Sequence, residues 1–158
     1  MLSFQSTSVD TTRELGYKFA SKLKKGDILV LNGDLGSGKT IFVSGFLSFY
    51  SKENEACSPT FTIVNEYNLT KDLNLYHFDV YRLESSDEFL AIGGDEYFTQ
   101  GISIIEWGNR IQDILPNEYL EVSIQKDSEN PDIRYFLFNP KGENYENLVK
   151  EVLELWEF

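Results

Sequence analysis

Hydrophobic side chains recur along this chain with two periods, and the order of the two predicts alternating helices and strands. A first helix is predicted to begin at the capping-box pair Thr11 and Glu14 and to end at Gly26. Its apolar face consists of Leu15, Phe19 and Leu23. The run that follows, "DILVLNG", is short, apolar and contains branched residues, which is typical of a buried strand.

A second helix is predicted after Lys39, where one face carries Phe42, Phe46, Phe49 and Tyr50. Further strands are predicted in "TFTIVNEYN", "NLYHFDVYRL" and "GISIIEWGNR", and short helices in "SSDEFLAIGG" and "RIQDILP". Apolar and polar residues alternate in "YLEVSIQ" and "RYFLFN", which predicts a hairpin of two strands. An amphipathic helix is predicted from Tyr145 to Trp156. This order predicts a single three-layer α/β domain over residues 1–158, with a mostly parallel central sheet and antiparallel additions.

Composition narrows the function classes. A net charge of −12 makes the chain a poor stand-alone nucleic-acid binder, so a partner would have to hold any RNA; alternatively, the acidity only aids solubility. There is no run of 18 apolar residues and no basic-then-apolar leader, so no membrane span or secretion signal is expected. The single cysteine, Cys57, excludes an internal disulfide and fits a cytoplasmic protein.

The stretch "GDLGSGKT" fits the phosphate-loop pattern G-x-x-x-x-G-K-[ST], between a predicted strand and a predicted helix. Such a loop turns backbone N–H groups toward nucleotide phosphates, and the following helix adds its positive N-terminal end. Lys39 is expected to reach the β- and γ-phosphates and the Thr40 hydroxyl to ligate Mg²⁺. The predicted fold is therefore of the P-loop NTPase type. The predicted loop residues are Gly33, Asp34, Leu35, Gly36, Ser37, Gly38, Lys39 and Thr40.

Hydrolysis needs a second acidic group at the tip of a neighbouring strand, and two candidates exist. Glu106 ends the apolar run "ISII", the pattern of a second metal-binding motif, and we expect it to be the Mg²⁺ carboxylate, directly or through water. Asp79 lies inside "LYHFDVYRL" and is expected to act behind the metal ligands or to position water. The alternative for either residue is a solvated strand end.

Three other features have two interpretations each. "CSPTFT", with Ser58 and Thr60, is either a segment that senses the γ-phosphate or an ordinary loop entering a strand. His77 lies on the same strand face as Asp79 and is a hydrogen-bonded core histidine or a general base. Trp107 belongs to the core or a lid, or else to the catalytic site.

Taken together, "GDLGSGKT", "SPTFTIVNEY", "YHFDVYRL" and "IEWGNR", in this order, resemble the bacterial TsaE family over nearly the whole chain. Departures are small: the family often has Ala at the position of Ser37 and Pro at that of Gly108. Neither change removes a functional side chain, although Gly108 alters the loop after the strand.

The resemblance implies a cytoplasmic, Mg²⁺-dependent ATPase needed to form threonylcarbamoyladenosine in tRNAs that read ANN codons. It also implies that the ATPase resets a TsaB–TsaD heterodimer, which would leave contact with tRNA to the partners. Carried over by motif, Lys39, Asp79 and Glu106 are catalytic, and Thr40 and Glu106 hold the metal. Beyond the loop, the residues assigned to the nucleotide are Ser58, Thr60, Trp107 and Arg134, the last near the base or a partner.

Two other functions remain open from the residues alone. A small-molecule kinase also combines a phosphate loop with a strand-tip carboxylate, but it usually adds an Arg-rich lid that this chain lacks. A nucleotide-sensing subunit would use ATP to organise an interface, with incidental hydrolysis. A GTPase is disfavoured, because no N-K-x-D stretch exists to read guanine.

Overall fold

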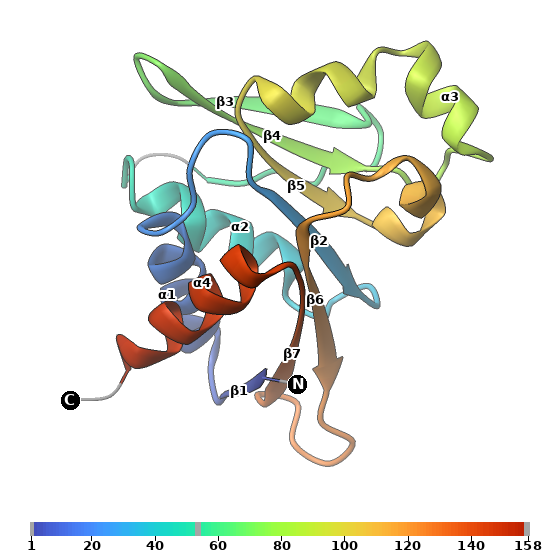
Figure 1. Cartoon of the computed structure of the whole chain (residues 1–158). Helices are drawn as coiled ribbons and strands as arrows, with labels where there is room; N and C mark the ends of the chain where they lie inside the picture. Colours follow the sequence, from blue (N-terminus) through green and yellow to red (C-terminus); the bar gives the residue numbers. More distant parts are fainter. Residues whose placement is uncertain (1, 53–54, 157–158) are drawn as a thin grey trace.

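A seven-stranded mixed sheet forms the centre of the protein, in the order β1-β7-β6-β2-β5-β4-β3 (Figure 1). The structure is a computed structural model that describes residues 2–52 and 55–156. The strands are β1 Leu2–Ser6, β2 Ile28–Gly33, β3 Val64–Thr70, β4 Leu73–Asp79, β5 Ile102–Glu106, β6 Tyr119–Lys126 and β7 Arg134–Lys141. The helices are α1 Val9–Ala20, α2 Lys39–Ser48, α3 Ser86–Ala91 and α4 Glu143–Glu154, with 3₁₀ segments η1 Gly94–Thr99 and η2 Gly108–Ile114.

The four central strands, β6, β2, β5 and β4, run parallel, and antiparallel strands complete both edges. β3 pairs with β4 as a hairpin, β7 pairs with β6, and β1 pairs with β7. This arrangement confirms the α/β class, the parallel centre and the antiparallel additions that the sequence predicted. Because the central strands are parallel, the carboxyl ends of β2, β4 and β5 lie next to one another at the same end of the sheet. This end is where ligands bind in open α/β sheets.

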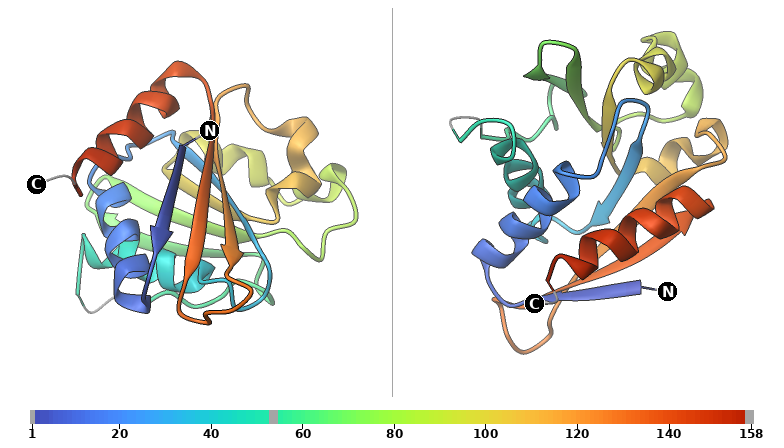
Figure 2. Two further views of the ribbon diagram at one scale, coloured as in Figure 1. Left: turned by 90° about the horizontal axis from the view of Figure 1, so that it is seen from below. Right: turned by 60° about the vertical axis from the view of Figure 1, so that its left-hand side comes forward.

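Helices cover both faces of the sheet, which gives the three layers (Figures 1 and 2). Helices α1, α2 and α4 pack on one face against alternate strand residues such as Leu29, Leu31 and Ile104. On the other face, α3, η1 and η2 pack against Ile28, Val30 and the other strand residues whose side chains point to that face. Strands β2, β4 and β5 are buried on both faces over most of their length, which is why they are largely apolar runs.

Helices α1 and α2 approach each other through two glycines. A Cβ atom on Gly16 would collide with the carbonyl oxygen of Phe42, and one on Gly45 with that of Arg13. Helix α2 is buried on several sides, including Val43 and Leu47, so its aromatic residues do not mark a single apolar face. Phe49, predicted within that face, caps the helix and is partly exposed.

The ends of several elements differ from the predictions. Ser8, rather than Thr11, is the N-cap of α1, and its side chain accepts a hydrogen bond from the Thr11 amide. The helix ends at Ala20, six residues before Gly26. β3 begins at Val64, because Ile63 has a left-handed backbone and the segment before it is a turn. β1 was not predicted at all.

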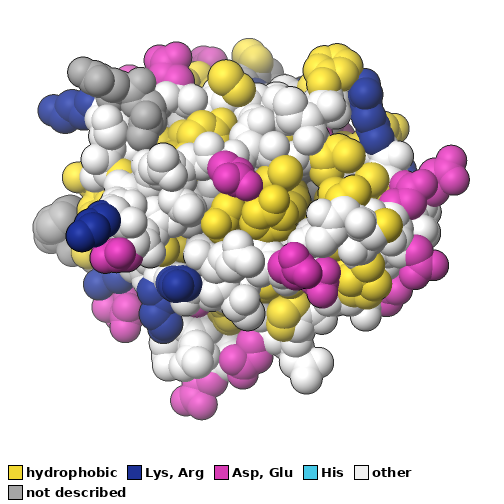
Figure 3. Space-filling view, turned by 90° about the horizontal axis from the view of Figure 1, so that it is seen from above, with side chains coloured by type: hydrophobic (Ala, Val, Ile, Leu, Met, Phe, Trp, Pro, Cys, Tyr) yellow, Lys and Arg dark blue, Asp and Glu magenta, His cyan; other side chains and the backbone are white. Residues whose placement is uncertain are grey.

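The surface agrees with the acidic composition. In the face that Figure 3 presents, Asp and Glu side chains lie among exposed apolar ones, and Lys and Arg side chains stand near the margins. That face offers no broad basic surface for a nucleic acid. Among the described residues, no helix is both long and apolar enough to cross a membrane.

Candidate functional site

The segment Gly33–Thr40 connects the end of β2 to the start of α2, the strand–loop–helix setting that the sequence predicted. Gly36 and Gly38 have φ values of +78° and +112°, which side chains with a Cβ atom rarely adopt. The Ser37 amide donates to the Asp34 carbonyl at 3.0 Å, so the loop folds back on itself before the helix starts. The glycines therefore let the loop curl around the positive end of α2.

Lys39, the first residue of α2, turns back into this loop. Its Nζ donates to the Gly33 carbonyl oxygen at 2.5 Å and lies 3.6 Å from Oε1 of Glu106. The ammonium group also lies 4.7 Å from the centre of the Trp107 ring. The side chain is 9% exposed, so the ammonium group is a buried cation at the mouth of the loop. Its present partners are groups that an anion can replace.

Glu106 and His77 form a buried pair beside Lys39. β4 and β5 bring them to the same face of the sheet, and His77 Nε2 lies 2.6 Å from Glu106 Oε2. Nδ1 of His77 has no partner among the described residues, so the proton is best placed on Nε2, from which the ring donates to the carboxylate. The interpretation of His77 as a hydrogen-bonded core histidine is confirmed. The sequence did not predict that Glu106 is the partner of His77. Spacing along a strand shows which residues share a face, but it does not show which strand lies beside it.

Asp79 lies directly opposite Glu106 in the β4–β5 register, but its oxygens have other partners. Oδ1 accepts from the Tyr81 amide at 3.0 Å, and Oδ2 accepts from the Thr60 hydroxyl at 3.2 Å. Thr60 in turn lies 2.7 Å from the Ser58 hydroxyl. The two carboxylates thus have different roles: Glu106 faces the phosphate loop, whereas Asp79 connects the Ser58–Thr60 segment to the end of β4.

Backbone strain occurs on both sides of this carboxylate pair. Ile63 and Trp107 have φ values of +68° and +63°, and they are the non-glycine residues with positive φ in the described part of the chain. Such a conformation is unusual for a β-branched residue, and strain of this kind concentrates at functional sites. The Asp79 amide donates to the Ile63 carbonyl at 2.8 Å, so the strained turn is fixed to β4.

Aromatic rings extend the site from Lys39 to the surface. The Trp107 ring lies 5.0 Å from that of Tyr81, and the Arg110 guanidinium lies 4.8 Å from the Tyr81 ring centre. The Arg82 guanidinium lies 4.5 Å from the ring centre of Phe61, which is 80% exposed. Trp107 is thus placed beside the phosphate loop, and its role with a nucleotide stays a prediction.

The β6–β7 hairpin supplies the opposite wall. Arg134, which we expected near the nucleotide base or a partner, donates from Nε to the Ser37 carbonyl at 3.0 Å. Lys126, which the sequence did not single out, donates from Nζ to the Leu35 carbonyl at 2.8 Å. A cavity of about 450 Å³ lies between this wall and the loop, lined by Asn32, Gly33, Asp34, Ser37, Ser123, Ile124, Gln125 and Lys126.

The donor groups fit Mg²⁺ bound together with phosphate. Within residues 2–52 and 55–156, no three His, Cys, Asp or Glu side chains gather into a metal cage. Mg²⁺ in phosphate sites takes one or two protein oxygens and completes its shell with phosphate and water. The Thr40 hydroxyl, adjacent to Lys39, and the Glu106 carboxylate are a donor set of that size.

Comparisons with known proteins agree on one family. A family model described as threonylcarbamoyl adenosine biosynthesis protein TsaE matches residues 6–134. The tRNA threonylcarbamoyladenosine biosynthesis protein TsaE of Bacillus subtilis is 40% identical over 96% of this chain and 93% of its own length. That of Rickettsia conorii is 32% identical over 93% of this chain and 84% of its own. A crystal structure of Bacillus subtilis YdiB superposes with a TM-score of 0.79 at 36% identity, covering 97% of this chain and 94% of that one.

Proposed function

The chain belongs to the TsaE family of tRNA threonylcarbamoyladenosine biosynthesis proteins, and from this premise we propose that it is an Mg²⁺-dependent ATPase subunit of that process. It would act on a TsaB–TsaD heterodimer and reset it between turnovers by binding and hydrolysing ATP. The heterodimer would hold the tRNA, which suits a chain with a net charge of −12. We place this activity in the cytoplasm, and the ATPase would be weak without its partners.

One observation carries the ATPase proposal: Lys39 lies between the Gly33 carbonyl, at 2.5 Å, and the Glu106 carboxylate, at 3.6 Å. These contacts hold a buried cation in the loop without a strong ion pair, because 3.6 Å is longer than a charge-assisted hydrogen bond of ~2.8 Å. Phosphate oxygens would therefore compete with the longer contact to Glu106 and not with a close ion pair. The same Glu106 carboxylate is fixed on its other side by His77.

Each residue then has a defined task. Bound ATP and Mg²⁺ would supply the cleavable phosphoanhydride and the cation that offsets its charge. Lys39 and the loop amides would bind the phosphates, and Thr40 and Glu106 would hold the metal. Asp79 would report the state of the site to the Ser58–Thr60 segment through the Thr60 hydroxyl.

The test is to mix the purified protein with TsaB and TsaD and to follow phosphate release from ATP. We expect association and stimulated release, and we expect Lys39→Ala to weaken nucleotide binding because a phosphate-facing cation is lost. Absence of both association and stimulation would refute the partner-dependent ATPase. Unchanged nucleotide binding by Lys39→Ala would refute the loop assignment.

The hydrogen bond from Thr60 to Asp79 also favours a second function, a nucleotide-sensing subunit in which binding alone moves the segment. Glu106→Gln separates the two functions. If this variant binds ATP, does not hydrolyse it and still supports many rounds of tRNA modification, binding carries the signal. If modification stops after one round, hydrolysis is required.

A further inference from the structure

Two cations on the β6–β7 hairpin hold the outer side of the phosphate loop. Lys126 ends β6, Arg134 begins β7, and the two residues lie opposite each other in the hairpin register. Lys126 Nζ donates to the Leu35 carbonyl at 2.8 Å, while Arg134 donates to the carbonyls of Ser37 at 3.0 Å and Gly36 at 3.3 Å. Three consecutive loop carbonyls, those of residues 35–37, are therefore occupied by two positive side chains, which we call the loop clamp.

The clamp is itself held in place by the hairpin turn. Nη1 of Arg134 donates to the carbonyls of Pro131 at 2.6 Å and Ile133 at 3.0 Å, so the guanidinium bridges the turn and the loop. The Tyr135 hydroxyl donates to Asp127 at 2.7 Å, and the Asp127 carboxylate also accepts two backbone amides of the turn. Figures 1 and 2 show the hairpin alongside the loop that follows β2. The cations are thus presented from a braced element.

Peptide geometry gives this contact a consequence for the loop interior. In a trans peptide the C=O and N–H groups point in opposite directions. Carbonyls of Leu35 and Ser37 that face the hairpin therefore turn the amides of Gly36 and Gly38 to the other side, away from the clamp. Both glycines have positive φ values and few intrinsic restraints, so the peptide planes depend on such outside contacts.

We propose that Lys126 and Arg134 are positioning residues that pre-form the phosphate loop for a triphosphate group without touching the nucleotide. They do so by fixing three carbonyls outward and offsetting the partial negative charge that those oxygens would otherwise present near an anion. This inference rests on the proposed function only in that the loop binds phosphate. It differs from a role of Arg134 at the nucleotide base, because a clamp acts equally on every ligand with a polyphosphate group.

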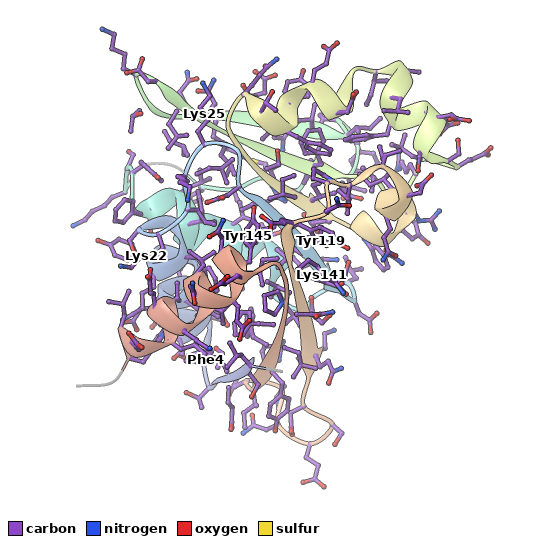
Figure 4. All side chains as sticks on the ribbon, viewed as in Figure 1. Phe4, Lys22, Lys25, Tyr119, Lys141 and Tyr145 are labelled. Atoms are coloured by element: carbon purple, nitrogen blue, oxygen red, sulfur yellow. The ribbon has the colours of Figure 1, made fainter. Side chains whose placement is uncertain are left out.

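The experiment measures binding of two probes in the presence of Mg²⁺: ATP and inorganic tripolyphosphate, which has no base or ribose. The variants are Lys126→Met and Arg134→Met, with Lys141→Met as the matched control. Lys141, labelled in Figure 4, ends β7 opposite Tyr119, whereas Lys126 and Arg134 pair at the other end of the hairpin. Each clamp variant is expected to bind both probes roughly tenfold more weakly, as loss of a charge-assisted hydrogen bond implies. The control and Lys126→Arg, which keeps the donor, are expected to bind as the wild type does.

A second measurement separates loop order from general stability. Amide hydrogen exchange at Ser37, whose N–H donates to the Asp34 carbonyl inside the loop, is expected to quicken in both clamp variants before any ligand is added, while the urea midpoint changes little. If ATP binding weakens but tripolyphosphate binding does not, Arg134 contacts the base and the clamp is refuted. If the clamp variants bind both probes as tightly as the wild type does, the clamp is refuted and the proposed function still stands. A wild-type protein that binds neither probe overturns the nucleotide function and the clamp together.

Discussion

Replacement of His77 by leucine would isolate the contact that fixes Glu106. The imidazole is fully buried, and its Nε2 lies 2.6 Å from Oε2 of a carboxylate that is 4% exposed. Leucine has a similar volume but no donor, so Oε2 of Glu106 would be left buried without a partner. The positive group beside this carboxylate is Lys39, which lies 3.6 Å from the other oxygen, Oε1.

The size of the effect follows from these contacts. A hydrogen bond to a charged group contributes about 1.5–3 kcal/mol, and an unpaired buried acceptor costs a similar amount. Part of this loss is offset because leucine also removes Nδ1, which has no partner in the described structure. We therefore expect the free energy of unfolding to fall by ~2 kcal/mol, which corresponds to a decrease of about 4–8 °C in Tm for a chain of this length.

A double-mutant cycle tests the pairing directly. The free energies of unfolding by urea are measured for the wild type, His77→Leu, Glu106→Ala and the double variant. We expect a coupling of ~1.5–2 kcal/mol, because residues in contact are not additive. Ser103→Ala is the matched control: Ser103 is another fully buried polar residue of β5, and its hydroxyl has no partner within the described residues. Its coupling to Glu106 is expected to be near zero.

A coupling below ~0.5 kcal/mol would refute the reasoning, since that is the scatter expected for independent sites. Hydrolysis gives a second readout. His77→Leu is expected to lower kcat about tenfold with little change in KM, and His77→Asn, which keeps a donor, is expected to recover part of that loss. Equal activity of the leucine and wild-type proteins would show that His77 does not position Glu106 for chemistry.

Three further predictions follow from other contacts. Asp79→Asn is expected to lower hydrolysis about tenfold and binding much less, because the Thr60 hydroxyl loses a charged acceptor; intact hydrolysis would make Asp79 structural. Gly45→Ala is expected to cost about 3 kcal/mol in urea unfolding, since its Cβ would meet the Arg13 carbonyl, whereas a neutral result would show that α1 shifts freely. Burial, with the nearby Asp27 charge, raises the pKa of Tyr145 to about 12 from 10.0. Between pH ~10 and pH ~12 the Tyr145 phenol therefore keeps its proton in the folded protein and loses it in the unfolded chain. Stability from Tyr145 is therefore complete below pH ~10 and is lost as the pH rises toward ~12, by up to ~2 kcal/mol, and Tyr145→Phe should remove this loss.

Local patterns gave most of the fold. The buried strands β2 and β5 were predicted because their apolar runs are continuous, and the β6–β7 hairpin because its two strands alternate around a polar turn. The short edge strand β1 was missed, because four residues that alternate between half-buried and exposed positions, followed by a buried serine, carry little signal by themselves. Its pairing with β7, more than a hundred residues away, stabilises it as a strand.

Candidate site residues were predicted where a motif fixes their chemistry. Lys39 and Glu106 were selected by the loop pattern and the strand-tip carboxylate, and the structure places them 3.6 Å apart. Lys126 was missed because a lysine at a hairpin end looks like any solvated charge. Arg134 was selected, but its contact with the Ser37 carbonyl could not be foreseen from the order of residues.

The sequence by itself predicted a phosphate loop and determined where it lies, between a strand and a helix, because glycines, a lysine and a hydroxyl at fixed spacing within eight residues form a recognisable pattern. It also determined the order of helices and strands, which depends on local periodicity. Only the tertiary structure decided which groups meet at the loop: His77 behind Glu106, Thr60 on Asp79, and the two cations of the hairpin on the loop carbonyls. These contacts depend on strand order and register, which arise when distant segments pair across the sheet, and no spacing along the chain encodes them.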